Sequence, residues 1–148
     1  SDMREGDREG FLNVFNERLC KGSLVGFCVT GGVFSEGIDL REENLVGAVV
    51  VGTGLPMICR KRDILKDYFN NCGKDGFAYS YVYPGMNKVL QSAGRVIRTD
   101  EDRGVILLLD ERFSDNRYRE IFPREWKDIA FCNLENTLQK IQKFWREK

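Results

Sequence analysis

LVGAVVVG, residues 45 to 52, is the stretch that decides the fold, because its side chains are small or apolar on both faces of an extended chain. Strands that are covered on both sides within a parallel sheet have this pattern. GVILLLD, residues 104 to 110, repeats it. SLVGFCVTGG, residues 23 to 32, predicts a further buried strand, and DIAFCN, residues 128 to 133, a short fourth one.

The segments around these strands have helical patterns. Leu134, Leu138, Ile141 and Trp145 form one stripe near the end of the chain, and Asn133 is suited to cap that helix. Strands that alternate with helices indicate an α/β fold with a mostly parallel sheet flanked by helices. A chain of 148 residues is enough for one domain. Helices are predicted over residues 4–20, 60–71, 85–98, 116–122 and 134–147.

The composition excludes several kinds of site. The chain has no histidine, which rules out His-based acid–base catalysis and Ser/His triads. Its five cysteines are scattered without a CxxC pair, so neither a disulfide framework nor a metal site is expected. The 23 basic residues are balanced by 23 acidic ones, which argues against nucleic-acid binding by bulk charge alone. No apolar run approaches the roughly 20 residues that span a bilayer, so no membrane partner is expected.

QSAGRVIR, residues 91 to 98, carries the most specific polar pattern. In a helix, at about 100° per residue, Gln91, Arg95 and Arg98 would share one face. Arginine pairs bind phosphate oxygens through their forked donors, so this face predicts an anion site. The alternative is a solvated face of an amphipathic helix. The opposite, apolar face would consist of Val89, Leu90, Ala93, Val96 and Ile97.

GGVFSEGIDL, residues 31 to 40, follows the first predicted strand. Open parallel sheets bind ligands beyond the carboxyl ends of their strands, and we expect both polar segments at or near that edge. Glycines here would let the backbone approach a ligand, although a plain glycine-rich turn fits equally well. Residues 107–111 resemble a Walker B strand, but the chain has no Walker A loop. The tyrosines of residues 79–85 are expected to pack rather than to stack on bases.

Taken together, GGVFSEGIDL and QSAGRVIR resemble motifs V and VI of superfamily 2 helicases, in particular the DNA helicases related to XPD and DinG. VVVGTGLP and GVILLLDERF match the same family in the right order. The resemblance implies a helicase C-terminal, RecA-like layered domain over residues 1–148, with motif V at 31–40 and motif VI at 91–98. Such a domain is the second motor domain of an ATP-dependent DNA helicase.

The resemblance also implies roles for single residues. Arg95 and Arg98 would be arginine fingers, and Gln91 would contact the γ-phosphate or the attacking water. This fits the chemistry of phosphoryl transfer, which needs positive charge near the transferring group. The other implied contacts are Glu36, Gly37 and Asp39 to ATP, and Thr30 and Ser35 to single-stranded DNA.

The family's first motor domain, with its Walker A lysine and DEAH acids, is absent from this sequence, and the start of the second domain looks truncated. We therefore expect ATP and Mg²⁺ to be held mainly by that first domain, and the chain alone to be inactive. The expected location is intracellular, either the bacterial cytoplasm or a eukaryotic nucleus. One alternative is a noncatalytic, helicase-like module that binds a protein through residues 134–145. A free-standing nucleotidase using Asp110 and Glu111 is a weaker one.

Overall fold

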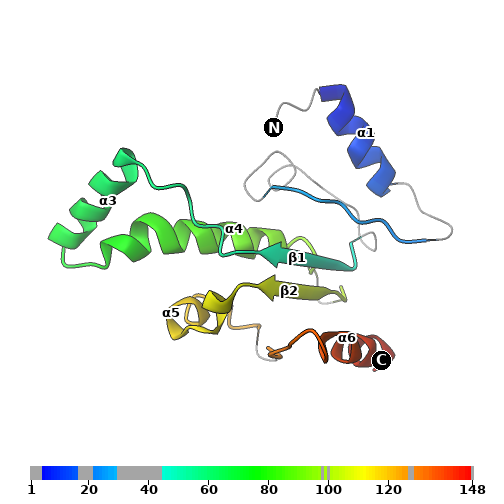
Figure 1. The fold of residues 1–148 in the computed structure, drawn as a ribbon. Coiled ribbons are helices and arrows are strands. Elements are labelled where there is room, and N and C mark those ends of the chain that lie inside the picture. The colour runs from blue at the N-terminus through cyan, green and yellow to red at the C-terminus, as the bar shows by residue number, and fades with distance from the viewer. Residues whose placement is uncertain are drawn as a thin grey trace.

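A computed structural model describes residues 5–16, 22–29, 45–97, 99, 101–126 and 129–147. Residues 31–40, the motif V-like stretch, lie outside these ranges. Along the chain the elements are α1 (Glu5–Asn16), β1 (Gly47–Val51), α3 (Arg60–Asn71), the π-helix η2 (Ala78–Val82), α4 (Tyr83–Ala93), β2 (Val105–Leu109), the 3-10 helix η3 (Glu111–Ser114), α5 (Asn116–Arg119) and α6 (Thr137–Arg146) (Figure 1).

The two valine- and leucine-rich stretches form the sheet, as predicted. β1 and β2 pair in parallel, in a register that runs from Gly47 opposite Val105 to Val51 opposite Leu109. Within the described ranges this sheet has two strands. The structure therefore confirms a mixed fold with a parallel sheet, whereas the full RecA-like layering is not seen in the described part of the chain.

The two other predicted strands are wrong where the structure describes them. Residues 22–29 are irregular, and Phe27 there is 93% exposed. A strand needs a neighbour for its backbone hydrogen bonds, which local sequence cannot provide. Residues 129–133 are also irregular. In that segment the Phe131 carbonyl accepts a hydrogen bond from the side chain of Lys140, at 2.7 Å from Nζ, rather than from a neighbouring strand.

The main core lies on one face of the sheet. Val50 is 5% exposed and packs with Met86 and Val89 of α4. Phe113, Tyr118 and the partly buried Leu108 belong to the same cluster. Val51 is 75% exposed, as expected for adjacent strand residues that point to opposite faces. The sheet is thus covered on its Val50 face and open on its Val51 face.

A close backbone crossing fixes α4 against the end of β1. The loop of residues 52–55 passes over Gly85, and a Cβ on Gly85 would lie 2.7 Å from the Thr53 carbonyl oxygen. A Cβ on Gly54 would lie 2.9 Å from the Gly85 oxygen, and the φ of Gly54 is +63°. Glycine is needed at both places because any side chain would collide with backbone. This crossing sets the position of α4, and hence of Gln91.

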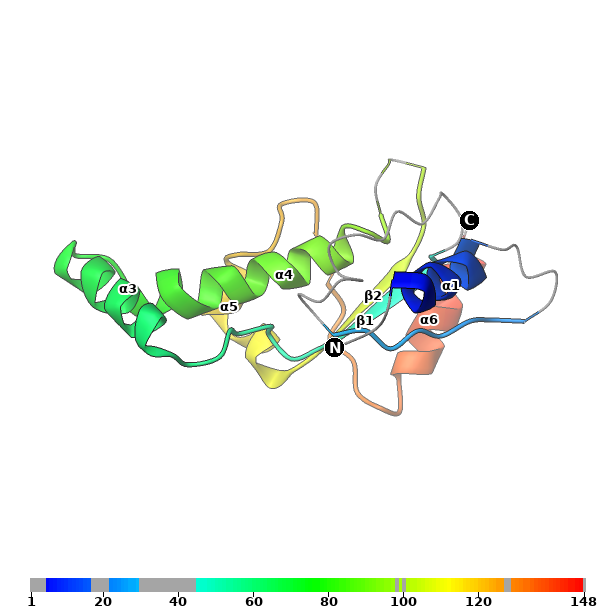
Figure 2. The ribbon, with the colours of Figure 1, turned by 90° about the horizontal axis from the view of Figure 1, so that it is seen from above.

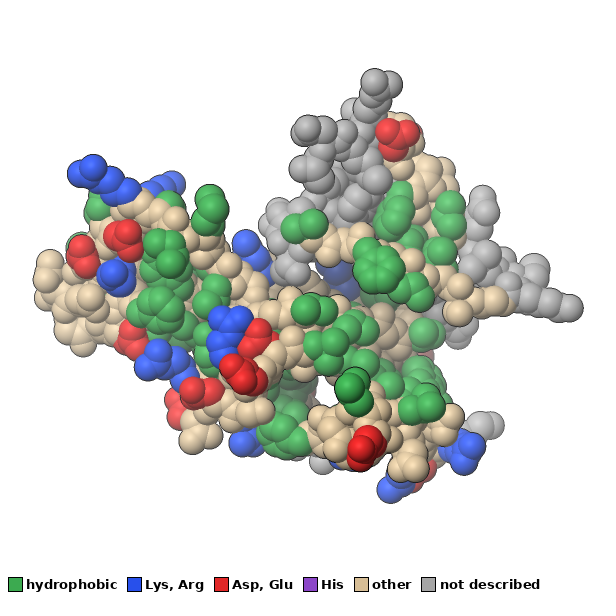
Figure 3. Space-filling model, in the orientation of Figure 1, with side chains coloured by type: hydrophobic (Ala, Val, Ile, Leu, Met, Phe, Trp, Pro, Cys, Tyr) green, Lys and Arg blue, Asp and Glu red, His purple; other side chains and the backbone are tan. Residues whose placement is uncertain are grey.

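α3 and η2 form a hairpin beyond the carboxyl ends of the strands, and α6 lies near the opposite, amino ends (Figures 1 and 2). The hairpin is held by the stacked rings of Phe69 and Tyr79, whose centroids are 4.4 Å apart, and by a 3.1 Å hydrogen bond from the Tyr81 hydroxyl to Asp63 Oδ1. Tyr81 packs within the protein, as predicted, whereas Tyr79 and Tyr83 contact other rings but are 37% and 39% exposed. Hydrophobic side chains still cover much of the hairpin's surface (Figure 3).

The remaining helices are shorter than predicted. α5 ends at Arg119, and the N–H groups of Ile121 and Phe122 then donate to carbonyls three residues back, so the chain tightens and leaves the helix before Pro123. α6 begins at Thr137, which leaves Leu134 outside the helix and fully exposed. The Asn133 side chain caps the turn before α6, accepting from the backbone N–H of Asn136 at 3.0 Å. None of the helices in the described ranges is long and apolar enough to cross a membrane.

Candidate functional site

α4 ends earlier than predicted, and this changes the geometry of the polar trio. The helix stops at Ala93, with Gly94 as its C-cap. The Gly94 N–H still donates to the Leu90 carbonyl at 2.8 Å, but the Val96 N–H donates to Ala93 at 3.0 Å, three residues back. Glycine is a poor helix residue, so the chain tightens and leaves the helix here. The prediction that one helix runs from residue 85 to 98 is therefore wrong, and Arg95 does not share a helix face with Gln91, whereas Arg98 lies outside the described residues.

The apolar side of this segment is partly as predicted. Val89, Ala93 and Val96 are buried, and Gln91 is exposed in the last turn of α4. Ile97 is exposed, contrary to expectation, because the helix does not continue to it. Arg95 follows the helix end and is half-buried. The buried side chains of Ala93 and Val96 thus flank Gly94 and Arg95 in the chain.

This polar end lies at the amino ends of the strands. Val96 packs against Gly104, the residue before β2, where a Cβ would collide with the Val96 side chain. The Val105 N–H donates to the Val46 carbonyl at 3.1 Å, which places the starts of β1 and β2 side by side. The expectation that this segment lies near the carboxyl ends is therefore wrong. α4 runs antiparallel to the strands and returns the chain to their starting edge.

The acidic turn after this segment is a structural link between motif VI and the last helix. Asp102 Oδ2 accepts the Thr99 N–H at 2.7 Å and closes the turn. Arg103 Nη2 donates to the carbonyls of Phe144 and Glu147 at 2.8 and 2.6 Å, and its guanidinium lies 5.0 Å from the Phe144 ring centroid. Sequence reasoning missed Arg103, because no local pattern connects residues that are 41 positions apart.

Asp110 and Arg112 have a structural role at the end of β2. Arg112 donates from Nε and Nη2 to the two carboxylate oxygens of Asp110, at 2.8 and 2.7 Å. Asp110 also accepts the Arg112 backbone N–H at 3.0 Å, as the N-cap of η3. These hydrogen bonds to Arg112 lower the pKa of the Asp110 carboxyl. The arrangement gives Asp110 an anchoring role at the end of β2 and leaves little of its carboxylate for the nucleotidase reaction considered above.

The other predicted site residues lie outside the described part of the chain. They are Arg98 of motif VI and Thr30, Ser35, Glu36, Gly37 and Asp39 in or near motif V. Over the ranges that the structure describes, no group of three or more His, Cys, Asp or Glu side chains could hold a metal ion. The described part of the predicted site is therefore Gln91 and Arg95.

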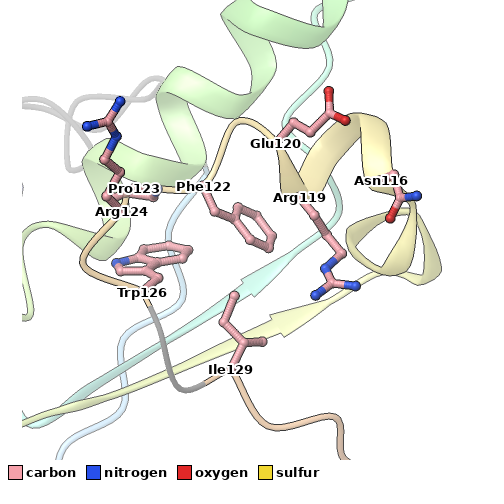
Figure 4. A pocket seen from close by; sticks show the side chains of 8 residues that line it. All are labelled: Asn116, Arg119, Glu120, Phe122, Pro123, Arg124, Trp126 and Ile129. Carbon is pink, nitrogen blue, oxygen red and sulfur yellow. The ribbon is translucent and has the colours of Figure 1, made fainter.

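A pocket of about 410 Å³ lies between α5 and the segment that follows it. Figure 4 shows Phe122, Trp126 and Ile129 grouped around it, with the Arg119 guanidinium beside Ile129. The Phe122 and Trp126 rings have centroids 5.3 Å apart. Sequence reasoning missed this pocket, although the alternation of arginines with large rings in RYREIFPREW, residues 117 to 126, was a usable signal.

Comparison with known proteins places this geometry in a family context. Residues 2–129 match the family described as the helicase C-terminal domain. Over 101 residues the chain is 32% identical to the ATP-dependent DNA helicase DinG of Photobacterium profundum, a match that covers 67% of this chain and 14% of the relative. It is 32% identical over 99 residues to the probable ATP-dependent helicase MJ0942 of Methanocaldococcus jannaschii, covering 61% and 15%.

A eukaryotic relative matches over a longer stretch. The chain is 28% identical over 130 residues to the regulator of telomere elongation helicase 1 homolog of Caenorhabditis briggsae, covering 81% of this chain and 13% of that protein. In these three matches the aligned region amounts to only 13–15% of the relatives' own length. The chain therefore corresponds to a small part of each relative.

Proposed function

The chain belongs to the helicase C-terminal domain family, as a relative of XPD and DinG, and on that premise we propose that it is the second motor domain of an ATP-dependent DNA helicase. In this proposal Arg95 and Arg98 are arginine fingers that reach ATP bound mainly by a first motor domain. Gln91 contacts the γ-phosphate or the attacking water. Arginine fingers act by placing positive charge on the oxygens of the transferring phosphoryl group.

The observation that carries the proposal is the way the protein presents Gln91 and Arg95. Gln91 is exposed in the last turn of α4, and Arg95 follows the helix end, between the buried side chains of Ala93 and Val96. A group that stabilises a transition state must be held in place before the reaction, and a buried anchor on each side supplies that rigidity. Amide and guanidinium donors suit the oxygens of a triphosphate.

The proposal assigns the remaining roles as follows. Glu36, Gly37 and Asp39 contact the nucleotide from motif V, and Thr30 and Ser35 contact single-stranded DNA. Mg²⁺ is held mainly by the first motor domain, as is ATP, and the isolated chain does not turn over ATP because fingers supply only one side of the site. Closure of the two motor domains on ATP, and reopening after hydrolysis, would move the DNA strand.

Single-turnover ATP hydrolysis by the full-length protein tests this proposal. We expect Arg95→Ala and Arg98→Ala each to lower the rate by about 10³-fold, the scale of an arginine finger. Arg95→Lys keeps the positive charge but loses the paired N–H donors of the guanidinium, so its hydrolysis rate should lie between those of the wild type and the alanine variant. Arg117→Ala, which removes an exposed arginine of α5, is the matched control and should leave the rate unchanged. Binding of single-stranded DNA should persist in all four variants.

The opposite result would favour the noncatalytic module. If hydrolysis is unchanged by both alanine substitutions, Arg95 and Arg98 belong to a solvated surface. One observation supports this second candidate: Leu138 and Trp145 of α6 are exposed, as a face for a protein partner would be. In that case substitutions in α6, rather than in motif VI, should weaken binding to the partner.

A further inference from the structure

The pocket beside α5 has two aromatic walls that the proposed motor chemistry does not use. The Phe122 ring packs against the buried Phe113, with the two ring centroids 6.3 Å apart, and this contact restricts its position. Trp126 packs against it at a tilt of 47° and is half-buried, which leaves part of the indole uncovered. Ile129 faces both rings across the pocket (Figure 4). A ligand that enters here must offer a flat apolar surface about the size of one ring system.

The polar group beside these walls is the guanidinium of Arg119. It lies 5.5 Å from the ring centroid of Phe131, which holds it in place without using its N–H donors. Arg119 is exposed and has no ion pair with any residue in the described ranges. Glu120 also lines the pocket, but its carboxylate points away from the rings (Figure 4). The pocket therefore combines N–H donors that can bind an anion, from Arg119, with a flat apolar surface formed by Phe122 and Trp126.

The position of the pocket also fits ligand binding. It is built from residues that follow β2, whose carboxyl end leads through η3 into α5. Open parallel sheets bind ligands beyond the carboxyl ends of their strands. Gln91 and Arg95 lie at the opposite, amino edge, as shown by the contact between Val96 and Gly104. The pocket is thus separate from the proposed ATP contacts.

We propose that this pocket holds one nucleotide of single-stranded DNA, with its base against Phe122 and Trp126 and its phosphate on Arg119. The match is chemical: a nucleotide joins a flat ring to an anion, and proteins that bind single strands pair aromatic rings with basic groups in this way. This inference rests on the proposed function, because it takes single-stranded DNA as the partner. It adds a contact at the carboxyl edge of the sheet, remote from motif VI.

Fluorescence anisotropy with labelled oligothymidylate tests the pocket in the full-length protein, without ATP. Stacking of one base is worth on the order of 10-fold or more in affinity, so Trp126→Leu should weaken binding by at least about that factor, and Trp126→Phe by much less. Arg119→Gln should weaken it by about 5-fold. Arg117→Gln removes the same charge from the same short helix, outside the pocket, and should have less than about a 2-fold effect.

An abasic oligonucleotide of equal length separates base contacts from phosphate contacts. Trp126→Leu should no longer weaken binding of the abasic probe, because the probe has no base to stack. Arg119→Gln should still weaken it, because the phosphates remain. Arg119 is exposed, so its variant also answers the question if Trp126→Leu fails to fold.

Two outcomes overturn the proposal. The first is oligothymidylate binding that responds equally to Arg119→Gln and Arg117→Gln and not at all to Trp126→Leu. The second is quenching of Trp126 fluorescence by a peptide with an aromatic residue beside acidic ones, and not by oligothymidylate, which would make the pocket a peptide site. Neither outcome depends on ATP hydrolysis, so failure here is distinguishable from failure of the arginine-finger proposal, which the Arg95 variants test.

Discussion

At the scale of single residues, Asp110 shows how one carboxylate can close a strand. It binds two donors of the Arg112 guanidinium and the Arg112 backbone N–H, while its own carbonyl accepts the Phe113 N–H at 3.2 Å. Charge-assisted, bidentate bonds of this kind are stronger than neutral ones. The chain therefore turns sharply after β2, and this turn delivers Phe113 to the core.

This carboxylate predicts a loss of stability in acid. Its pKa is lowered in the folded protein, so its contribution is fully present above the unfolded pKa of about 3.9 and is lost as pH falls through the folded value. Because the Arg112 side chain is 43% exposed, solvent screening limits the effect to about 1 kcal/mol or less. Urea unfolding of the wild type and Asp110→Asn should show a stability gap at pH 6 that narrows below pH 4.

Asp67→Asn, on the exposed surface of α3, is the control for this measurement. Its stability relative to the wild type should not change with pH in the same way. Identical pH profiles for the two variants would show that the pair with Arg112 contributes nothing specific.

At the scale of elements, the sequence predicts what local pattern determines. α3 has the predicted bounds, and β1 and β2 lie within one or two residues of theirs. The periodicity of apolar residues is a local property, and it was sufficient there. It failed at Gly94, where helical periodicity continues in the sequence but the helix ends. It also failed for residues 22–29, because strand pairing depends on a neighbour that is distant in sequence.

The same distinction applies to the site. The exposure of Gln91 and the buried positions of Val89 and Ala93 could be predicted from helical spacing. The sequence did not predict the edge of the sheet at which these residues lie, because that depends on the length of α4 and on the crossing at Gly85. The pocket could not be predicted either, because Arg119, Phe122 and Trp126 form it only through the turn that follows α5.

The link between α6 and the motif VI turn leads to a prediction for Arg103. Its guanidinium caps two carbonyls at the end of α6, where the helix dipole also favours a positive charge. We expect Arg103→Ala to lower the free energy of unfolding by about 1–2 kcal/mol. Urea titration followed by tryptophan fluorescence would measure this, because Arg103 also lies 5.8 Å from the Trp145 ring. Arg117→Ala should change the free energy by less than about 0.5 kcal/mol.

At the scale of the whole molecule, one core joins the middle of the chain, whereas α3 and α6 have no buried residues. β1, α4, η2 and the segment after β2 all contribute to a single buried cluster, while the opposite face of the sheet is open. The proposed ATP contacts and the proposed nucleotide pocket lie at opposite edges of this sheet. Both edges therefore connect to the same core, through α4 on one side and Phe122 on the other.

The one-sided core predicts opposite results for two neighbouring valines. Val50→Thr buries a hydroxyl and should lower the free energy of unfolding by about 1–3 kcal/mol. Val51→Thr places the same hydroxyl on the open face and should change it by less than about 0.5 kcal/mol. Thermal or urea unfolding of the two variants provides the comparison. Equal losses would mean that the Val51 face is covered in solution.

The crossing of residues 52–55 over Gly85 has a consequence for how this sequence can diverge. The obstacles to a side chain at Gly54 and at Gly85 are backbone atoms, so no change at one position makes room at the other. At most contacts between side chains, a second substitution can compensate for the first. No such pair of substitutions can accommodate side chains at Gly54 and Gly85. We therefore expect relatives that keep this crossing to retain both glycines, even where the residues around them have changed.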